Sequence, residues 1–92
     1  MATRKVARLG DTSTHGGVII TTNTDETVFA EGQPIAVKGA KLQCGNSQHG
    51  IVEIVDNVAI KTFVNGKPVV LEGSVATCGA VIIVNQDTVK VE

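Results

Sequence analysis

The sequence predicts an all-β domain built from three similar β-hairpin units, and three observations support this fold class. Its apolar residues are mainly Val, Ile, Leu and Ala, with two Phe and no Trp or Tyr, and β-branched residues favour pleated strands. No long segment shows the 3.6-residue apolar period of an amphipathic helix. Finally, a short apolar strand, a Gly and a metal-capable side chain five residues later form a motif that occurs three times.

The three units align on the glycine of this motif and on the His or Cys that follows it: Gly10 and His15, Gly39 and Cys44, Gly73 and Cys78. The apolar strands that precede these glycines are residues 6–9, 35–38 and 69–72. The β-rich runs that follow are residues 18–20, 51–55 and 81–84, and polar turns end them at 23–25, 56–57 and 85–87. A returning strand follows each turn, and two copies close with a second turn, at 32–34 and 66–68. Three similar units predict an arrangement around a pseudo-threefold axis.

All His and Cys residues of the chain stand in one dipeptide context, because each is followed by glycine. They are His15, Cys44, His49 and Cys78. The middle unit carries an extra stretch, residues 45–48, which supplies His49 as a fourth candidate. Two thiolates and two imidazoles suit tetrahedral Zn²⁺. We therefore expect one structural Zn²⁺ site that staples the three units together.

Alternative roles for these residues stay open. Cys44 and Cys78 could pair as a disulfide in a small protein that leaves the cell, although this would leave both histidines without a role. Buried free thiols acting as small apolar residues are a further possibility. The glycines could serve only to permit sharp turns, and this role is compatible with metal binding because it lets loops converge on one ion.

The sequence argues against an enzyme. A zinc ion held by four protein ligands has no open position for water or substrate, which is typical of a structural site. Asp11 could be mistaken for a catalytic acid, but an Asx-turn at a strand end is the commoner role, and Ala40 and Ser74 stand at its place in the other units. No Ser-His-Asp grouping, phosphate-binding glycine loop or spaced carboxylate pair is present.

Size and charge restrict the remaining classes. We expect a single domain over residues 1–92, for which a structural zinc could contribute a large share of the net stability of about 5–15 kcal/mol. Eight basic and nine acidic residues leave a formal charge of −1, and the chain lacks an aromatic platform for stacking bases, so we expect no nucleic-acid partner. No apolar region follows Arg4 and Lys5, so we expect synthesis in the cytoplasm without a signal peptide.

The residues also resemble a known family. Residues 10–17, 34–39, Cys44 with His49-Gly50, residues 65–68 and Cys78-Gly79 look like a PAAR-repeat protein over essentially the whole chain. The Pro-Ala-Ala-Arg motif itself is eroded: residues 6–8 keep Ala and Arg, residues 34–37 keep Pro and Ala, and residues 68–71 keep only Pro. Some members carry a three-His, one-Cys site, whereas this chain offers two of each.

This resemblance implies a small conical domain that caps and sharpens the trimeric β-helical spike of a contractile injection apparatus. Such an apparatus is a type VI secretion system or a contractile phage tail, and the spike is a VgrG-like protein or a phage tail spike. The resemblance also implies a zinc ion near the point of the cone, transient contact with the target membrane during piercing, and secretion with the spike or a place on the virion tail.

The internal repeat agrees with that partner. One asymmetric chain can cap a threefold end only by imitating its symmetry, so we expect one chain per spike trimer. An open β-helix end leaves backbone groups unpaired, and strand addition would satisfy them. The chain starts its first repeat by Val6 and ends at Glu92, so we expect a bare tip whose effector cargo, if any, binds non-covalently.

Two further hypotheses belong to other classes. One is a free-standing structural zinc-binding adaptor without a spike partner, which would be expected to carry charged or aromatic recognition residues. The other is a small zinc hydrolase with one ligand position vacated. Metal content and a ligand-by-ligand substitution series would separate both from a spike tip.

Overall fold

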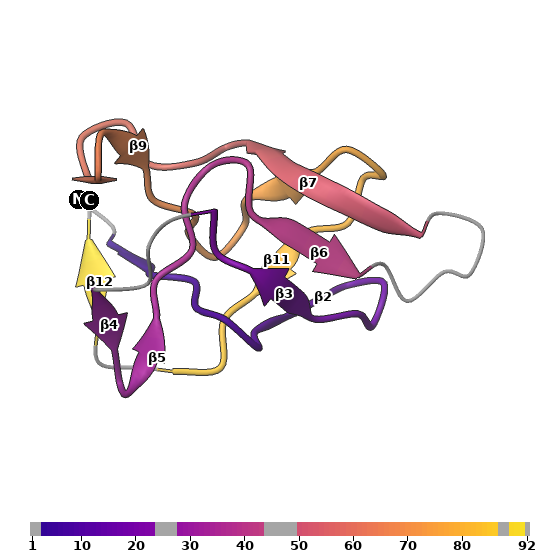
Figure 1. Cartoon of the computed structure of the whole chain (residues 1–92), viewed down its shortest axis with the longest axis horizontal. Coiled ribbons are helices and arrows are strands. Elements are labelled where there is room, and N and C mark those ends of the chain that lie inside the picture. Colours follow the sequence, from indigo (N-terminus) through magenta and orange to yellow (C-terminus); the bar gives the residue numbers. More distant parts are fainter. Residues whose placement is uncertain (1–2, 24–27, 44–49, 87–88, 92) are drawn as a thin grey trace.

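The computed structural model describes residues 3–23, 28–43, 50–86 and 89–91. These residues form an all-β fold of short strands that tapers from one end to the other (Figure 1). The strands are β1 Arg4–Lys5, β2 Thr12–Ser13, β3 Ile19–Thr21, β4 Phe29–Ala30, β5 Gln33–Pro34, β6 Lys41–Gln43, β7 Ile51–Asp56, β8 Phe63–Val64, β9 Lys67–Pro68, β10 Val75–Ala76, β11 Ile82–Ile83 and β12 Lys90–Val91. Within this part of the chain, no helix is long and apolar enough to cross a membrane.

A closed triangle of backbone hydrogen bonds lies at the centre of the molecule. The Ala7 N–H donates to the Val70 carbonyl, Val70 donates to Ala36, and Ala36 donates back to Ala7, at 2.9, 2.9 and 3.0 Å. All three residues are fully buried, and they are the central residues of the three apolar segments that the sequence aligns. Because each repeat donates to one neighbour and accepts from the other, the triangle fixes a pseudo-threefold axis.

The same cyclic order is repeated above and below the triangle. Isolated bridges pair Val6 with Leu71, Arg8 with Ile35, and Val37 with Val69. Next to them, β2 pairs with β11, β6 with β3, and β10 with β7, so each repeat adds its strand to the preceding repeat in the ring. This interlocking allows strands of two or three residues to be stable, since isolated two-stranded hairpins are marginal in water.

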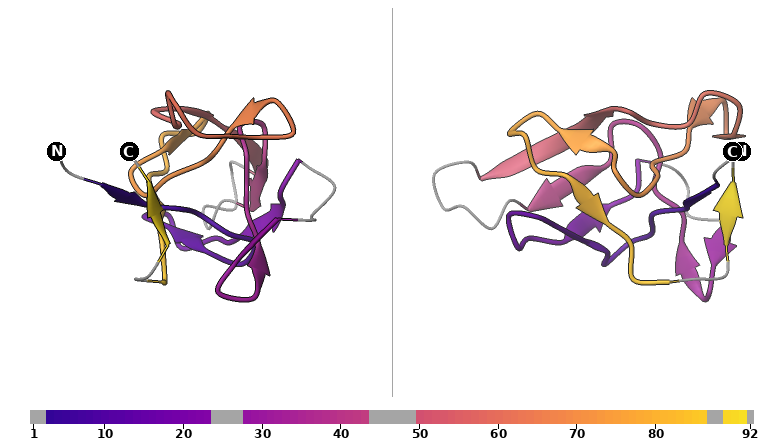
Figure 2. Two further views of the ribbon diagram at one scale, coloured as in Figure 1. Left: turned by 90° about the vertical axis from the view of Figure 1, so that its left-hand side faces the viewer. Right: turned by 180° about the vertical axis from the view of Figure 1, so that it is seen from behind.

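Three two-stranded hairpins occupy the wide end. Two of them, β4–β5 and β8–β9, are continuous, and both turn through two residues with positive φ: Glu31 (49°) with Gly32 (81°), and Asn65 (53°) with Gly66 (79°). The third hairpin is formed by the two ends of the chain, because β12 pairs antiparallel with β1. Figure 2 (left) looks onto this end and shows the three hairpins around the middle of the molecule.

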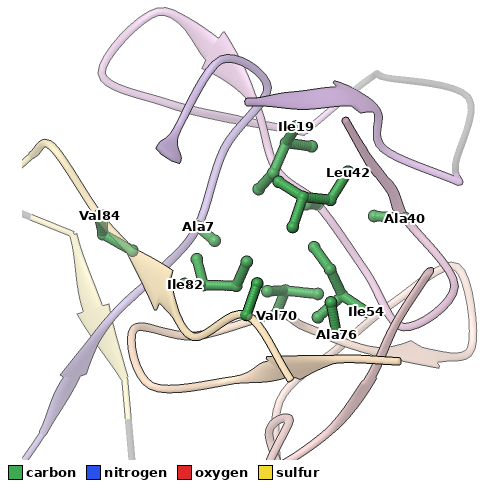
Figure 3. Packing of buried hydrophobic residues seen from close by; sticks show 11 residues of the cluster. Ala7, Ile19, Ala40, Leu42, Ile54, Val70, Ala76, Ile82 and Val84 are labelled. Carbon is green, nitrogen blue, oxygen red and sulfur yellow. The ribbon is translucent and has the colours of Figure 1, made fainter. Parts of the chain in front are cut away.

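The core is divided into two apolar clusters. The larger contains the triangle residues together with the side chains of the narrower half, shown in Figure 3: among them Ile19, Leu42, Ile54, Ala76 and Ile82. The smaller lies beneath the three hairpins and contains Val6, Ala30, Ile35, Ala59, Val69 and Leu71. Each cluster takes residues from all three repeats, so no repeat has a core of its own. The all-β, three-unit fold expected from the sequence is confirmed.

Candidate metal centre

The candidate ligands that the structure describes lie on loops at the narrow end, opposite the three hairpins (Figure 1). His15 lies in the loop between β2 and β3, and Cys78 lies in the corresponding loop between β10 and β11. Each is followed by a glycine with the same backbone conformation, with φ of 89° at Gly16 and 90° at Gly79. This left-handed conformation is easily adopted only by glycine, which accounts for the shared dipeptide.

Backbone bonds hold these two loops against each other. The Thr14 N–H donates to the Val81 carbonyl at 2.9 Å, and the Val81 N–H donates to the Thr14 hydroxyl at 3.1 Å. The Ser13 hydroxyl also accepts from the His15 N–H at 3.3 Å. The loops are therefore positioned by the strands beneath them, and side chains at residues 15 and 78 are directed to a common place.

His15 and Cys78 meet there. The Cys78 Sγ lies 3.7 Å from the His15 Nδ1, and both residues are half-buried. Two ligands bound to one tetrahedral zinc, with Zn–S of about 2.3 Å and Zn–N of about 2.0 Å, stand about 3.5 Å apart. The observed separation suits a shared zinc ion as well as a direct thiol–imidazole hydrogen bond. The chemistry and spacing of this pair thus fit half of a zinc site.

The other two predicted ligands, Cys44 and His49, lie outside the described residues. Among the residues that the structure does describe, no group of three or more His, Cys, Asp or Glu side chains is close enough to hold a metal ion. The four-ligand site and the Cys44–Cys78 disulfide therefore both stay predictions. The loop bonds nevertheless follow the threefold order, because Gln43 donates to Val18 and Thr77 to Glu53 as Thr14 does to Val81.

Asp11 has a structural role that differs in detail from an Asx-turn. Its carboxylate, only 1% exposed, accepts from the Arg8 backbone N–H at 2.8 Å and from the Arg8 guanidinium at 3.1 Å. It also accepts from the Asn85 N–H at 3.4 Å, which links the first repeat to the third. The backbone N–H that donates to Asp11 belongs to the third residue before it, whereas in an Asx-turn the donor lies two residues after the Asp. Ser74 does the same in its repeat by accepting from the Leu71 N–H at 3.0 Å.

Sequence reasoning missed the apolar side chains exposed at the wide end. Phe29 is 56% exposed, Phe63 is 54% exposed and Ile60 is 81% exposed. A signal was present in the sequence, since the chain has only two Phe and each stands five residues before a proline, at Pro34 and Pro68. Other large apolar side chains are exposed on the narrower half, Ile51 (60%) the most, but the two exposed Phe both lie at the wide end and mark it as a candidate interaction surface.

The fold and these two ends define a class of protein: a small threefold-repeat β domain with His15 and Cys78 on converging loops at one end and exposed aromatic side chains at the other. Comparison with protein families matches residues 9–84 to the PAAR motif. The chain belongs to the PAAR motif family, whose domains are conical and act at the spike tip of contractile injection systems. No curated protein matches the chain.

Proposed function

We propose that this protein caps the blunt end of a trimeric β-helical spike in a contractile injection apparatus and narrows that end to a point. The observation that carries the proposal is the closed triangle of hydrogen bonds through Ala7, Ala36 and Val70. It gives a single chain the threefold face that the end of a homotrimer requires. The wide end, with three hairpins around this axis, is the face that docks on the spike.

The narrow end carries the piercing point, and we propose that a structural zinc stabilises it. A metal would add rigidity to the loops that carry His15 and Cys78, beyond the backbone bonds that hold them against each other. His15 and Cys78 would each supply a ligand from a different repeat, with Cys44 and His49 completing the set. Such a zinc would add a cross-link between repeats that already share paired strands and two apolar clusters. Metal bonds of this kind contribute directly to folding free energy.

This role is mechanical and requires no catalysis. The buried carboxylate of Asp11 is engaged by Arg8 and Asn85, and a zinc with four protein ligands would have no position for substrate. We propose that the protein is loaded onto the spike in the cytoplasm, contacts the target envelope briefly, and carries any effector non-covalently. Whether the machine is a type VI secretion system or a phage tail does not alter this mechanism.

Co-elution with a spike tests the proposed function. A trimeric β-helical spike protein from the same genome, mixed with the purified chain, should give one complex on size exclusion at an earlier volume than either component. A β-helical spike truncated before its last turn is the matched control and should not bind. Elution of chain and intact spike as separate peaks would instead favour the free-standing zinc-binding adaptor.

A further inference from the structure

The three hairpins at the wide end expose unlike side chains at equivalent positions. Strand register places Phe29 opposite Pro34, Phe63 opposite Pro68, and Lys90 opposite Lys5. We name these three cross-strand pairs the corners of the wide end. Two corners are therefore an aromatic ring beside a proline, and the third is a pair of lysines.

Each corner lies on the outer side of its hairpin. The residues that follow in the strands, Ala30, Val64 and Val91, pack on the smaller apolar cluster. Successive side chains of a strand point to opposite faces, so the corner residues before them project away from the core. Phe29 and Phe63 are 56% and 54% exposed, and Lys90 is exposed as well.

A homotrimeric partner must meet these three corners with three identical sites. The corners are related by the same pseudo-threefold axis as the central triangle, yet they differ in chemistry. A site that accepts a Phe ring must therefore also accept a Lys side chain. Lysine can do this because its four-carbon stem packs along apolar surface while its ammonium group stays at the rim.

We infer that the spike end carries three identical apolar pockets, each with a carboxylate at its rim, and that Phe29, Phe63 and Lys90 fill one pocket each. This inference rests on the proposed function and adds the chemistry of the partner. Phe29 and Phe63 contribute apolar burial, and the Lys90 ammonium group pairs with the rim carboxylate of the third pocket. Binding is then mainly apolar, with one charge pair that salt can screen.

Titration calorimetry with a spike trimer from the same genome tests the inference through Lys90. At about 0.1 M salt, Lys90→Met should weaken binding roughly tenfold and Lys90→Glu roughly a hundredfold, since the latter sets two carboxylates together. At about 1 M salt, wild type and Lys90→Met should bind alike, because the charge pair is screened. Lys38→Met, which removes another exposed lysine, is the control and should bind as wild type does.

A sharper test replaces the Phe at a second corner by the Lys that stands at the third. Phe63→Lys should keep affinity within about tenfold of wild type and roughly double the salt dependence, whereas Phe63→Ala should lose more than about tenfold without changing it. The side chains of Phe63 and Lys90 are both exposed, so we expect these variants to keep the fold. Wild-type binding that Lys90→Glu leaves unchanged, or Phe63→Lys binding no better than Phe63→Ala, would contradict the inference alone. No binding by wild type would overturn the proposed function and this inference with it.

Discussion

At the scale of single residues, one position of the repeat carries three different side chains, two of which make the same backbone hydrogen bond. Asp11, Ala40 and Ser74 are all buried at the turn that follows the central triangle. Asp11 and Ser74 each accept a hydrogen bond from the backbone N–H three residues before them, and Ala40 has no side-chain acceptor. Only Asp11 also holds a guanidinium, that of Arg8, whose side chain is 11% exposed. The first repeat is thus tied by a nearly buried ion pair.

Removing the Asp11 carboxylate should destabilise the fold without changing the zinc content of the chain. Asp11→Ala leaves the Arg8 guanidinium and N–H without their acceptor, and we expect a loss of about 2–4 kcal/mol in unfolding free energy. Asp11→Ser should recover part of this loss, because Ser74 already makes the equivalent backbone bond. Urea unfolding measures both variants. Equal stability of Asp11→Ala and wild type would show that the ion pair has no net role.

The second prediction at the residue scale concerns His15 and Cys78, the two proposed zinc ligands at the narrow end. We expect elemental analysis to find one zinc per chain, and Cys78→Ser or His15→Ala to lower the melting temperature by about 15 °C or more, because a lost ligand removes much of the metal's contribution. Thr77→Ala, on the same loop as Cys78, serves as the control and should melt near wild type.

Mass spectrometry of the purified protein addresses the alternative role of the cysteines. If the purified chain contains no metal and its mass shows a Cys44–Cys78 disulfide, the zinc site is wrong and the disulfide links the repeats instead. His49→Ala should behave like His15→Ala if the extra stretch of the middle repeat supplies the fourth ligand.

At the scale of elements, the glycine before each ligand loop adopts the same conformation in all three repeats, and Gly39 also lies against a residue of the preceding repeat. Gly10, Gly39 and Gly73 have φ of 91°, 93° and 92°, so all three adopt the same left-handed conformation. A Cβ on Gly39 would also collide with the side-chain amide of Asn23, which donates to the Lys38 carbonyl at 2.8 Å. A Cβ on Gly10 would meet no atom within 4 Å.

Gly39→Ala should therefore be more destabilising than Gly10→Ala. Both variants carry the cost of a left-handed alanine, about 1–3 kcal/mol, and Gly39→Ala adds about 1 kcal/mol for the displaced Asn23 bond. In the Asn23→Ala background this difference should vanish, which thermal unfolding of the four variants can measure. Equal losses at the two glycines in the wild-type background would mean that the Asn23 contact is not significant.

The elements also show what local sequence could predict. The positions of the three apolar segments and of their glycines were predicted correctly, because each depends on residues close in sequence, although the segments form isolated bridges and not full strands. The pairing of β12 with β1 was not, since it joins the ends of the chain and no turn residue marks it. The Glu31-Gly32 turn lies one residue earlier than the second turn predicted at 32–34, because Glu31 adopts a positive φ that its residue type does not suggest.

The candidate site was predictable only in part, because the internal repeat aligns some of its residues and not others. Register within the repeat brought His15 and Cys78 together, and they do meet. The extra stretch before His49 has no counterpart in the other repeats, so no internal comparison fixes its position. The exposed Phe29 and Phe63 were overlooked because the apolar residues of a β-rich chain give no sign of which face they share until the hairpins are placed.

At the scale of the whole molecule, the fold converts one chain into an object with threefold geometry and two unlike ends. The larger apolar cluster contains the central triangle and supports the narrow end, and the smaller cluster lies beneath the hairpins of the wide end. In the proposed role, force applied at the narrow end would pass through interlocked strands from all three repeats to the wide end. Because the threefold symmetry lies within a single chain, the protein does not have to form a trimer to match a trimeric partner. We therefore expect the isolated chain to be monomeric.

Native mass spectrometry of the chain bound to its spike tests the central claim most directly. A pseudo-threefold cap occupies the whole end of a trimer, and a second copy on the same end would overlap the first. The measured mass should therefore correspond to one chain and three spike subunits, even with the chain in large excess. A complex of three chains per trimer would contradict the account, because each spike subunit would then bind its own copy and the internal symmetry would serve no purpose.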